Sequence, residues 1–226
     1  MIHHHPGDEL LLAHAAGTLQ AGHALVVGAH AEGCAHCRAR LCTFEALGGA
    51  MLETLEPAHL APEALARTMA RIDGTAPRRT AAAPAPAPAA TAAPGGWPDL
   101  PAGTPWPSSL AGCVVSRWRW LGPGMRWSRV TLPHDPAANV FLLRIGAGKC
   151  LATHTHSNSE LTQVLYGRFD DGRALFGPGD FDEADGSIHH QPVVQAGSEC
   201  ICLASVQGKV VFDNFLARWL GAAVGM

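Results

Sequence analysis

The stretch His30-Ala-Glu-Gly-Cys34-Ala-His36-Cys37 carries a histidine and two cysteines in the spacing His-x3-Cys-x2-Cys. Two thiols three residues apart can reach one ion from a single helical turn, and the imidazole of His30 lies about one turn earlier. Structural zinc takes about four nitrogen or sulfur ligands in a tetrahedron, so this motif supplies three of them. We therefore expect a zinc site here, rather than two small buried thiols beside a surface histidine.

The fourth ligand of this site must come from another segment, and the spacing leaves several histidines open. A histidine near the N-terminus can fold back across the helices, whereas His36 lies inside the Cys-x2-Cys turn and would usually point away. Three consecutive N-terminal histidines can also be interpreted as a shortened purification tag, although such tags normally carry more. The candidates are His3, His4, His5, His14, His23 and His36.

Residues 1–73 are expected to form a small helical bundle around this site. Two acids at Asp8 and Glu9 favour a helix start, and apolar residues recur at spacings of three and four further along. The last helix, from Pro62 to Asp73, carries an apolar stripe that we expect to supply part of a docking face. A core this small would be strengthened by a metal ion. The expected helices cover about residues 8–16, 19–30, 34–56 and 62–73.

The composition narrows the classes of function. The chain has 47% hydrophobic and 15% charged residues and a net charge of −3, so it has no positive excess with which to follow a phosphate backbone. We therefore expect no direct contact with nucleic acid. Polar residues interrupt the most apolar N-terminal run, and the N-terminus lacks the pattern of a signal peptide, so we expect neither a membrane span nor secretion. Seven cysteines, an odd number, then suit ligands and buried thiols in the cytoplasm.

The charge of the helical segment indicates the kind of partner. Residues 1–73 contain eight acids and four arginines. An acidic helical domain suits a basic protein surface, such as one that otherwise meets nucleic acid. The alternative interpretation is a solvated surface with no partner.

Residues 74–107 differ sharply from the segments on either side. They hold nine of the 17 prolines of the chain, including Ala-Pro-Ala-Pro-Ala-Pro at 83–88. Such a sequence is typical of an extended spacer, so we place the domain boundary here. After it, short apolar or alternating runs separated by glycine and proline predict a β-sandwich or barrel. The expected strands cover residues 114–120, 127–132, 140–145, 161–169, 172–176, 193–195, 199–205 and 210–215.

A second candidate metal site lies in this β region, in the pattern Gly148-x5-His154-x-His156-x3-Glu160-x6-Gly167. Residues two apart in a strand face the same side, so both histidines can enter the mouth of a barrel. Glu160 would follow on that side if the local chain stays extended. A later histidine, His189 or His190, would complete three imidazoles and one carboxylate. Such a site leaves a coordination position open, unlike a closed Cys/His site.

The second motif resembles the first signature of cupins, and all five of its fixed positions match. The second cupin signature matches less well. Gly172-x5-Pro178 fits it, but Gly179 follows the proline directly, and the usual asparagine after the last histidine is absent. In this resemblance His190, followed by Gln191-Pro192-Val193, is the better final ligand, with His189 in reserve.

The motif of His30, Cys34 and Cys37 resembles that of zinc-binding anti-sigma domains. Such a domain, a proline-rich spacer and one cupin together resemble the ChrR family of anti-sigma factors over nearly the whole chain. Alignment through Asp8 and residues 15–19 then puts the fourth zinc ligand on His5. Further supporting stretches are Ala15-Ala-Gly-Thr-Leu19, Leu25-Val-Val27, Cys37-Arg-Ala-Arg40 and Cys200-Ile-Cys-Leu-Ala204.

The resemblance implies an α+β chain with three parts: a zinc-binding helical bundle at 1–73, an Ala/Pro-rich linker at 74–107 and a cupin β-barrel at 108–226. It implies a non-enzymatic regulator that binds an extracytoplasmic-function (ECF) sigma factor, with 1:1 stoichiometry expected, and hides surfaces needed for core RNA polymerase. The cupin would hold zinc or another divalent metal such as iron, manganese or nickel. It would sense singlet oxygen or organic hydroperoxide, after which the sigma factor is released.

Two other functions are compatible with a cupin that has three histidines and one carboxylate. The first is a metal-dependent dioxygenase or isomerase in which the zinc domain is an accessory. The second is a regulator that senses a metabolite rather than an oxidant.

Three cysteines lie near the cupin motif. Cys150 precedes the expected ligand strand, and Cys200 and Cys202 share one strand face. These thiols are either ordinary core residues or sites of oxidation near the metal.

Overall fold

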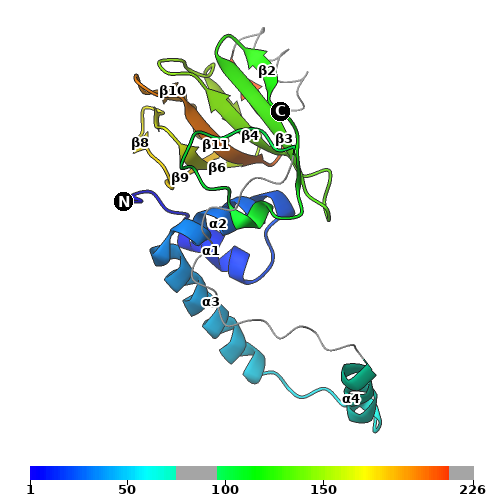
Figure 1. Cartoon of the computed structure of the whole chain (residues 1–226). Coiled ribbons are helices and arrows are strands. Elements are labelled where there is room, and N and C mark those ends of the chain that lie inside the picture. The colour runs from blue at the N-terminus through cyan, green and yellow to red at the C-terminus, as the bar shows by residue number, and fades with distance from the viewer. Residues whose placement is uncertain (75–95, 214–226) are drawn as a thin grey trace.

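The structure is a computed structural model that describes residues 1–74 and 96–213 (Figure 1). Most of the proposed linker and the last part of the proposed cupin domain, residues 75–95 and 214–226, lie outside the described residues. The helices are α1 (Asp8–Ala15), α2 (Ala21–Gly33), α3 (Ala35–Glu53), α4 (Ala64–Gly74) and the short 3-10 helix η1 (Ser108–Leu110). The strands are β1 (Val114–Val115), β2 (Arg119–Gly122), β3 (Met125–Thr131), β4 (Val140–Ile145), β5 (His154–His156), β6 (Ser159–Tyr166), β7 (Phe169–Asp170), β8 (Leu175–Phe176), β9 (Phe181–Asp185), β10 (Val193–Val194), β11 (Cys200–Val206) and β12 (Val210–Phe212).

The order of helices followed by strands confirms the expected fold class. The largest sheet has the strand order β1-β3-β4-β11-β6-β9, with β2 added on β3, and its pairings are antiparallel. Two smaller sheets, β10-β7-β8 and β12-β5, complete the β part. Within the described residues the strands therefore form a cupin-like sandwich of three sheets, and their hydrogen bonds do not close one barrel.

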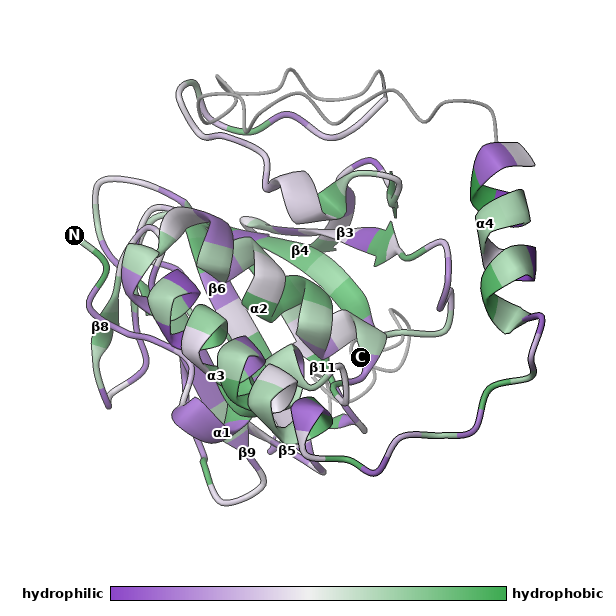
Figure 2. Cartoon of the chain, turned by 90° about the horizontal axis from the view of Figure 1, so that it is seen from below, coloured by the Kyte–Doolittle hydropathy of each residue, from purple (hydrophilic) through white to green (hydrophobic). Residues whose placement is uncertain are grey.

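Helix α2 lies against β11 and β6 of the large sheet, and α1 packs on α3 and α2 (Figures 1 and 2). Val26 and Val27 of α2 are completely buried, in one cluster with Val140 and Leu142 of β4 and Leu203 of β11. The helical part therefore shares a hydrophobic core with the sheet. This packing places α2 against β11 and against β6, the strand that carries Glu160.

Helix α3 begins in this core and then leaves it. Cys37 and Leu41 are buried in its first two turns, whereas Leu47 and Met51 further along are 51% and 63% exposed. In Figure 1 the helix projects away from the sheet, and α4 lies apart from the sheet beyond its far end. The apolar stripes predicted for the third and fourth helices are present, but they face outward beyond the middle of α3.

Several strand predictions differ from the structure in detail. The run expected at 161–169 is divided into β6 and β7 by Gly167, whose φ is +73° and whose Cβ would lie 2.0 Å from the carbonyl oxygen of Glu199. The run at 114–120 is likewise divided between β1 and β2. Strand β9 was not predicted, because three of its five residues are acidic.

Two candidate metal centres

The first centre brings together the four residues expected to bind zinc: His5, His30, Cys34 and Cys37. Cys34 ends α2 and begins α3, and its extended backbone (φ −107°, ψ 103°) turns the chain between them. His30 Nε2 lies 3.2 Å from Cys37 Sγ, and His5 Nδ1 lies 3.3 Å from Cys34 Sγ and 3.5 Å from Cys37 Sγ. One ligand atom from each of the four residues fits within a group in which no two atoms are more than 4.8 Å apart.

These distances fit one tetrahedral ion. Zinc–sulfur bonds of about 2.3 Å and zinc–nitrogen bonds of about 2.0–2.1 Å place neighbouring ligand atoms roughly 3.3–3.8 Å apart. His30 Nδ1 donates a hydrogen bond to the carbonyl oxygen of Gly179 at 3.0 Å, which leaves the Nε2 lone pair directed at the cysteines. The donor set therefore has the tautomer, distances and ligand types that a structural zinc ion requires.

The protonation state of the two cysteines would depend on whether a cation is bound. Burial lowers the pKa of His30 to about 4, so its imidazole is neutral at pH 7 and can donate its lone pair. Burial, followed by the neighbouring Cys34 thiol, raises the pKa of Cys37 to about 12. A coordinated divalent cation reverses this effect, because a ligating thiol is deprotonated.

The other histidines that the spacing left open lie elsewhere. His3 and His4 use their backbone amides to bind Asp180, and His23 is buried between Ser159 and Ser205. The His36 ring lies 4.9 Å from that of His5, centroid to centroid, outside the group of four ligands. His14 is half-buried on α1.

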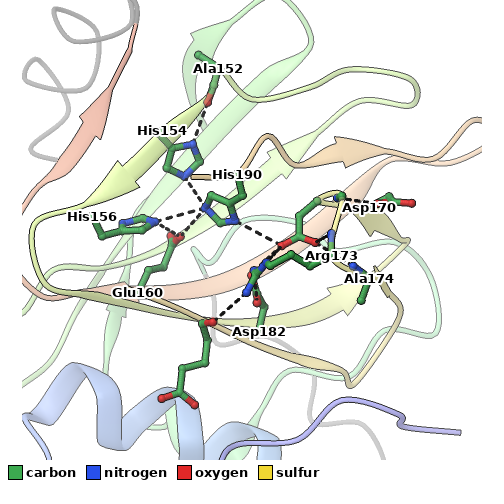
Figure 3. A network of polar contacts seen from close by, with 12 residues as sticks. Ala152, His154, His156, Glu160, Asp170, Arg173, Ala174, Asp182 and His190 are labelled. Carbon is green, nitrogen blue, oxygen red and sulfur yellow. Dashed lines mark hydrogen bonds and ion pairs between the residues drawn. The ribbon is translucent and has the colours of Figure 1, made fainter. Parts of the chain in front are cut away.

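The second centre lies inside the β sandwich, where His154, His156, Glu160 and His190 converge (Figure 3). His190 Nε2 lies 3.1 Å from His154 Nε2 and 3.4 Å from His156 Nε2, and His156 Nε2 lies 3.1 Å from a Glu160 carboxylate oxygen. His154 donates its Nδ1 hydrogen to the carbonyl oxygen of Ala152 at 2.8 Å, so the Nε2 atom of the neutral ring carries a free lone pair. Several nitrogen lone pairs and a carboxylate directed at one point suit a divalent cation.

Glu160 reaches this centre by a different path from the one expected. Residues 157 and 158 bend the chain between β5 and β6, so Glu160 comes from the next strand and not from an extended continuation of β5. Strand β5 pairs with β12, whereas β6 pairs with β11 and β9. The carboxylate is ionised: burial acts to raise the pKa of Glu160, but the hydrogen bond from His156 and the three imidazoles keep it below its ordinary value.

His190 and not His189 completes the geometric group. The backbone of His190 forms a bridge with His154, exchanging two hydrogen bonds of 3.1 Å, which turns its side chain inward beside that histidine. The His189 side chain is 58% exposed and lies 3.7 Å from a carboxylate oxygen of Asp213.

A buried charged network that the sequence did not predict supports His190. Its Nδ1 atom faces Asp171 Oδ2 at 3.5 Å, and Arg173 forms an ion pair with Asp171. Arg173 also forms an ion pair with Asp182, as Figure 3 shows. Burial, offset in part by Arg173, raises the pKa of Asp182 to about 6. Asp171, Asp182 and His190 also lie close enough to share a cation, but the guanidinium of Arg173 already supplies the positive charge there.

A cavity of about 40 Å³ opens beside the second centre. It is lined by His154, Glu160 and His190 together with apolar side chains and the thiols of Cys200 and Cys202, whose sulfur atoms are 3.7 Å apart. Its volume suits a water-sized molecule. The hydrogen bond with Cys200, followed by burial, raises the pKa of Cys202 well above that of an ordinary thiol, so it is not an activated thiolate. Cys150 is exposed at the surface.

Comparisons with known proteins identify the family to which this chain is similar. Residues 110–209 match the family described as the ChrR cupin-like domain. The chain is 38% identical over 222 residues to the anti-sigma-E factor ChrR of Cereibacter sphaeroides, a match that covers 96% of this chain and 95% of that protein. Among solved structures, the crystal structure of Rhodobacter sphaeroides SigE in complex with the anti-sigma ChrR matches with a TM-score of 0.70 and 34% identity, and covers 92% of this chain and 100% of that chain.

The family resemblance inferred from the two motifs is thereby confirmed, and so is the expectation of a regulator rather than an enzyme. Within the described residues, no helix has the length and apolar character needed to cross a membrane. The similarity to an anti-sigma factor extends over nearly the whole chain, and the cupin-like sandwich matches the family model. The chain therefore belongs to the ChrR family of anti-sigma factors.

Proposed function

We propose that this protein binds an ECF sigma factor 1:1 in the cytoplasm and keeps it from core RNA polymerase. We also propose that singlet oxygen or organic hydroperoxide, sensed through the cupin centre, releases the sigma factor. The observation that carries the proposal is an exposed apolar face on α3 and α4 of a chain whose 38%-identical relative is an anti-sigma factor.

This docking face, as we name it, runs along the far half of α3, the connection to α4, and α4 itself. Its side chains are between 48% and 80% exposed. A protein in water rarely leaves so many large apolar side chains uncovered unless a partner covers them. Amphipathic helices of this kind bind by placing their apolar stripe in a groove. The docking face consists of Leu47, Met51, Leu52, Leu55, Leu60, Leu65 and Met69.

The charge of the helical part supports the same kind of partner. Residues 1–73 contain eight acids against four arginines, and Glu63 on the turn before α4 is beside the docking face. Sigma factors carry basic surfaces that contact DNA, and acidic side chains around an apolar patch would steer such a surface into place.

The proposed zinc ion would determine where the docking face is held. Its ligands come from the N-terminal segment, the end of α2 and the first turn of α3. Bound zinc supplies folding free energy and fixes the angle between two helices. Because the docking face begins on the far half of α3, loss of zinc would release this helix from its position relative to the sheet.

The cupin centre is proposed to hold zinc, iron, manganese or nickel. Three imidazoles and one carboxylate leave a coordination position open on a five- or six-coordinate metal, and the adjoining cavity of about 40 Å³ has room for a molecule of a few atoms such as dioxygen. A cavity of this volume favours a small signal molecule over the larger organic substrate of an enzyme. The cavity also places Cys200 and Cys202 within reach of such a signal.

The docking proposal is tested by charge substitution on α4. The double variant Leu65→Asp, Met69→Asp should retain the fold, because both side chains are exposed, and should lose capture of the co-expressed sigma factor. The control is Leu175→Asp on β8, which changes a 46% exposed leucine outside the docking face. Full capture by the α4 variant would overturn the proposal.

A further inference from the structure

The segment that carries His5 is held by a loop of the cupin part, residues 177–181. The backbone amides of His3 and His4 both donate to Asp180 Oδ1, at 2.6 Å and 3.0 Å. The amide of Phe181 donates to the carbonyl oxygen of His4 at 3.1 Å. The N-terminal segment thus lies alongside the start of β9, although more than 170 residues separate them in sequence.

The same loop also holds a second expected zinc ligand. The carbonyl oxygen of Gly179 accepts the Nδ1 hydrogen of His30 at 3.0 Å, and the ring of Phe181 lies edge-on to the His30 ring with centroids 5.4 Å apart. Three consecutive residues of the cupin part therefore contact the two histidines of the Cys/His centre or the segment that carries them.

The loop is built for these contacts. Asp180 is only 3% exposed, and its second carboxylate oxygen accepts the amide of Gly177 at 2.8 Å, so the carboxylate is fully engaged by backbone donors. Gly179 has a φ of +87°, and a Cβ there would lie 2.8 Å from the side chain of Ile2. Glycine is thus required both for the turn and for the approach of the N-terminal segment.

We propose that Asp180 is a positioning residue of the Cys/His centre, so that the metal affinity of the helical domain depends on a loop of the cupin. The inference rests on the zinc site in the proposed function. His5 is exposed and lies on a terminal segment. Unless such a segment is already held in place, it loses conformational entropy when its histidine binds a metal, which weakens binding. Asp180 reduces that loss, because it fixes the two residues that precede His5.

The test compares full-length variants by chelator competition for zinc. Asp180→Ala should lower zinc affinity about 10–100-fold, the range expected when an outer-shell partner is removed. Asp180→Asn should lose less, because its amide oxygen can still accept from His3 and His4. The matched control is Asp185→Asn at the end of β9, because among the described residues the Asp185 carboxylate accepts hydrogen bonds from the local Ser187 alone.

A spectroscopic readout separates positioning from general destabilisation. With Co²⁺ in place of zinc, thiolate-to-metal charge-transfer bands arise from the Cys/His centre, because the cupin ligand set contains no thiolate. The visible cobalt bands of Asp180→Ala should change as His5 is lost, while the circular dichroism spectrum of the folded protein is unchanged. If Asp180→Ala does not fold, the inference is tested by comparing the zinc affinity of Asp180→Asn with that of Asp185→Asn.

Unchanged zinc affinity together with an unchanged cobalt spectrum in Asp180→Ala would overturn this inference. Cys34→Ala distinguishes the two levels of the account. If Cys34→Ala retains zinc at this centre, the proposed zinc site itself is wrong. If it loses zinc while the Asp180 variants bind as the wild type does, only the role of the loop is wrong.

Discussion

His190 Nδ1 lies 3.5 Å from Asp171 Oδ2, and both side chains are buried in the cupin sandwich. Asp171 is in turn held by Arg173 and by the backbone amide of Ala174 at 3.1 Å. At 3.5 Å the approach of Asp171 to His190 is a charge contact and not a hydrogen bond, and the negative carboxylate favours a proton on Nδ1 of His190, which leaves the Nε2 lone pair to face a metal. The cupin centre thus extends beyond its four expected ligands.

Asp171→Asn should therefore weaken metal binding at the cupin centre by about tenfold, because a neutral amide orients the imidazole less strongly. Metal content after dialysis against a graded chelator measures the change. Asp170→Asn is the matched control, since within residues 1–74 and 96–213 this neighbouring carboxylate accepts a hydrogen bond only from the amide of Gly172. Equal metal retention in the two variants would show that Asp171 has no part in the site.

Cys34→Ala should lose one equivalent of zinc and sigma-factor binding together. The reason is that the proposed zinc ion would join the N-terminal segment, α2 and α3, and a bundle of this size would derive much of its stability from it. Zinc content and sigma-factor affinity are measured on the same preparation. Cys42→Ala, on an exposed thiol of α3, should keep both. Full inhibition by a zinc-free Cys34→Ala protein would refute the structural role of the metal.

Glu160→Gln should leave sigma-factor binding intact and abolish the response to oxidant. The carboxylate is a cupin ligand in this account and lies far from the docking face along α3 and α4. Sigma-factor release is followed after exposure to singlet oxygen or an organic hydroperoxide, with the wild type in parallel. Loss of binding before any oxidant is added would mean instead that the cupin centre is needed for the inhibitory fold.

Acid should loosen the contact between α2 and the sheet at His23. Its ring nitrogens lie 2.9 Å from Ser205 Oγ and 2.9 Å from Ser159 Oγ, and burial, opposed by the charge of Glu160, lowers its pKa to about 4. The unfolded chain, with a histidine pKa of about 6.5, binds the proton first. Stability is therefore lost as the pH falls from about 6.5 to about 4, by about 3 kcal/mol at most.

His23→Gln removes this titration but can still hydrogen-bond both serines. The free energy of unfolding, measured from pH 7 to pH 4, should consequently fall less steeply in the variant than in the wild type. Identical pH profiles would show that His23 is protonated equally in the folded and unfolded states.

Much of the site was predictable because it depends on local spacing. His30 lies in the last turn of α2 and Cys37 in the first turn of α3, with Cys34 between the two helices, so eight consecutive residues bring three ligands together. His154 and His156 share one face of a strand. The position of His5 came only from family resemblance, because spacing cannot show which distant segment folds back. His190 was preferred over His189 on the same basis.

The parts that sequence reasoning missed are held by long-range polar contacts. Strand β9 carries acids, and hydropathy places such residues on the surface; Asp182 is nevertheless buried, because Arg173 lies beside it. The support of His30 by Gly179 is a backbone contact with no side-chain signal. The apolar stripes of α3 and α4 were recognised, but periodicity cannot distinguish a face that packs internally from one that a partner covers.

The most direct test is transcription by core RNA polymerase reconstituted with an ECF sigma factor from the cells that make this protein. Adding the purified full-length chain before core polymerase should suppress the transcripts, with suppression complete near one equivalent of chain per sigma factor. If transcription is unchanged at a several-fold molar excess of the zinc-loaded protein, the account of an anti-sigma factor is wrong.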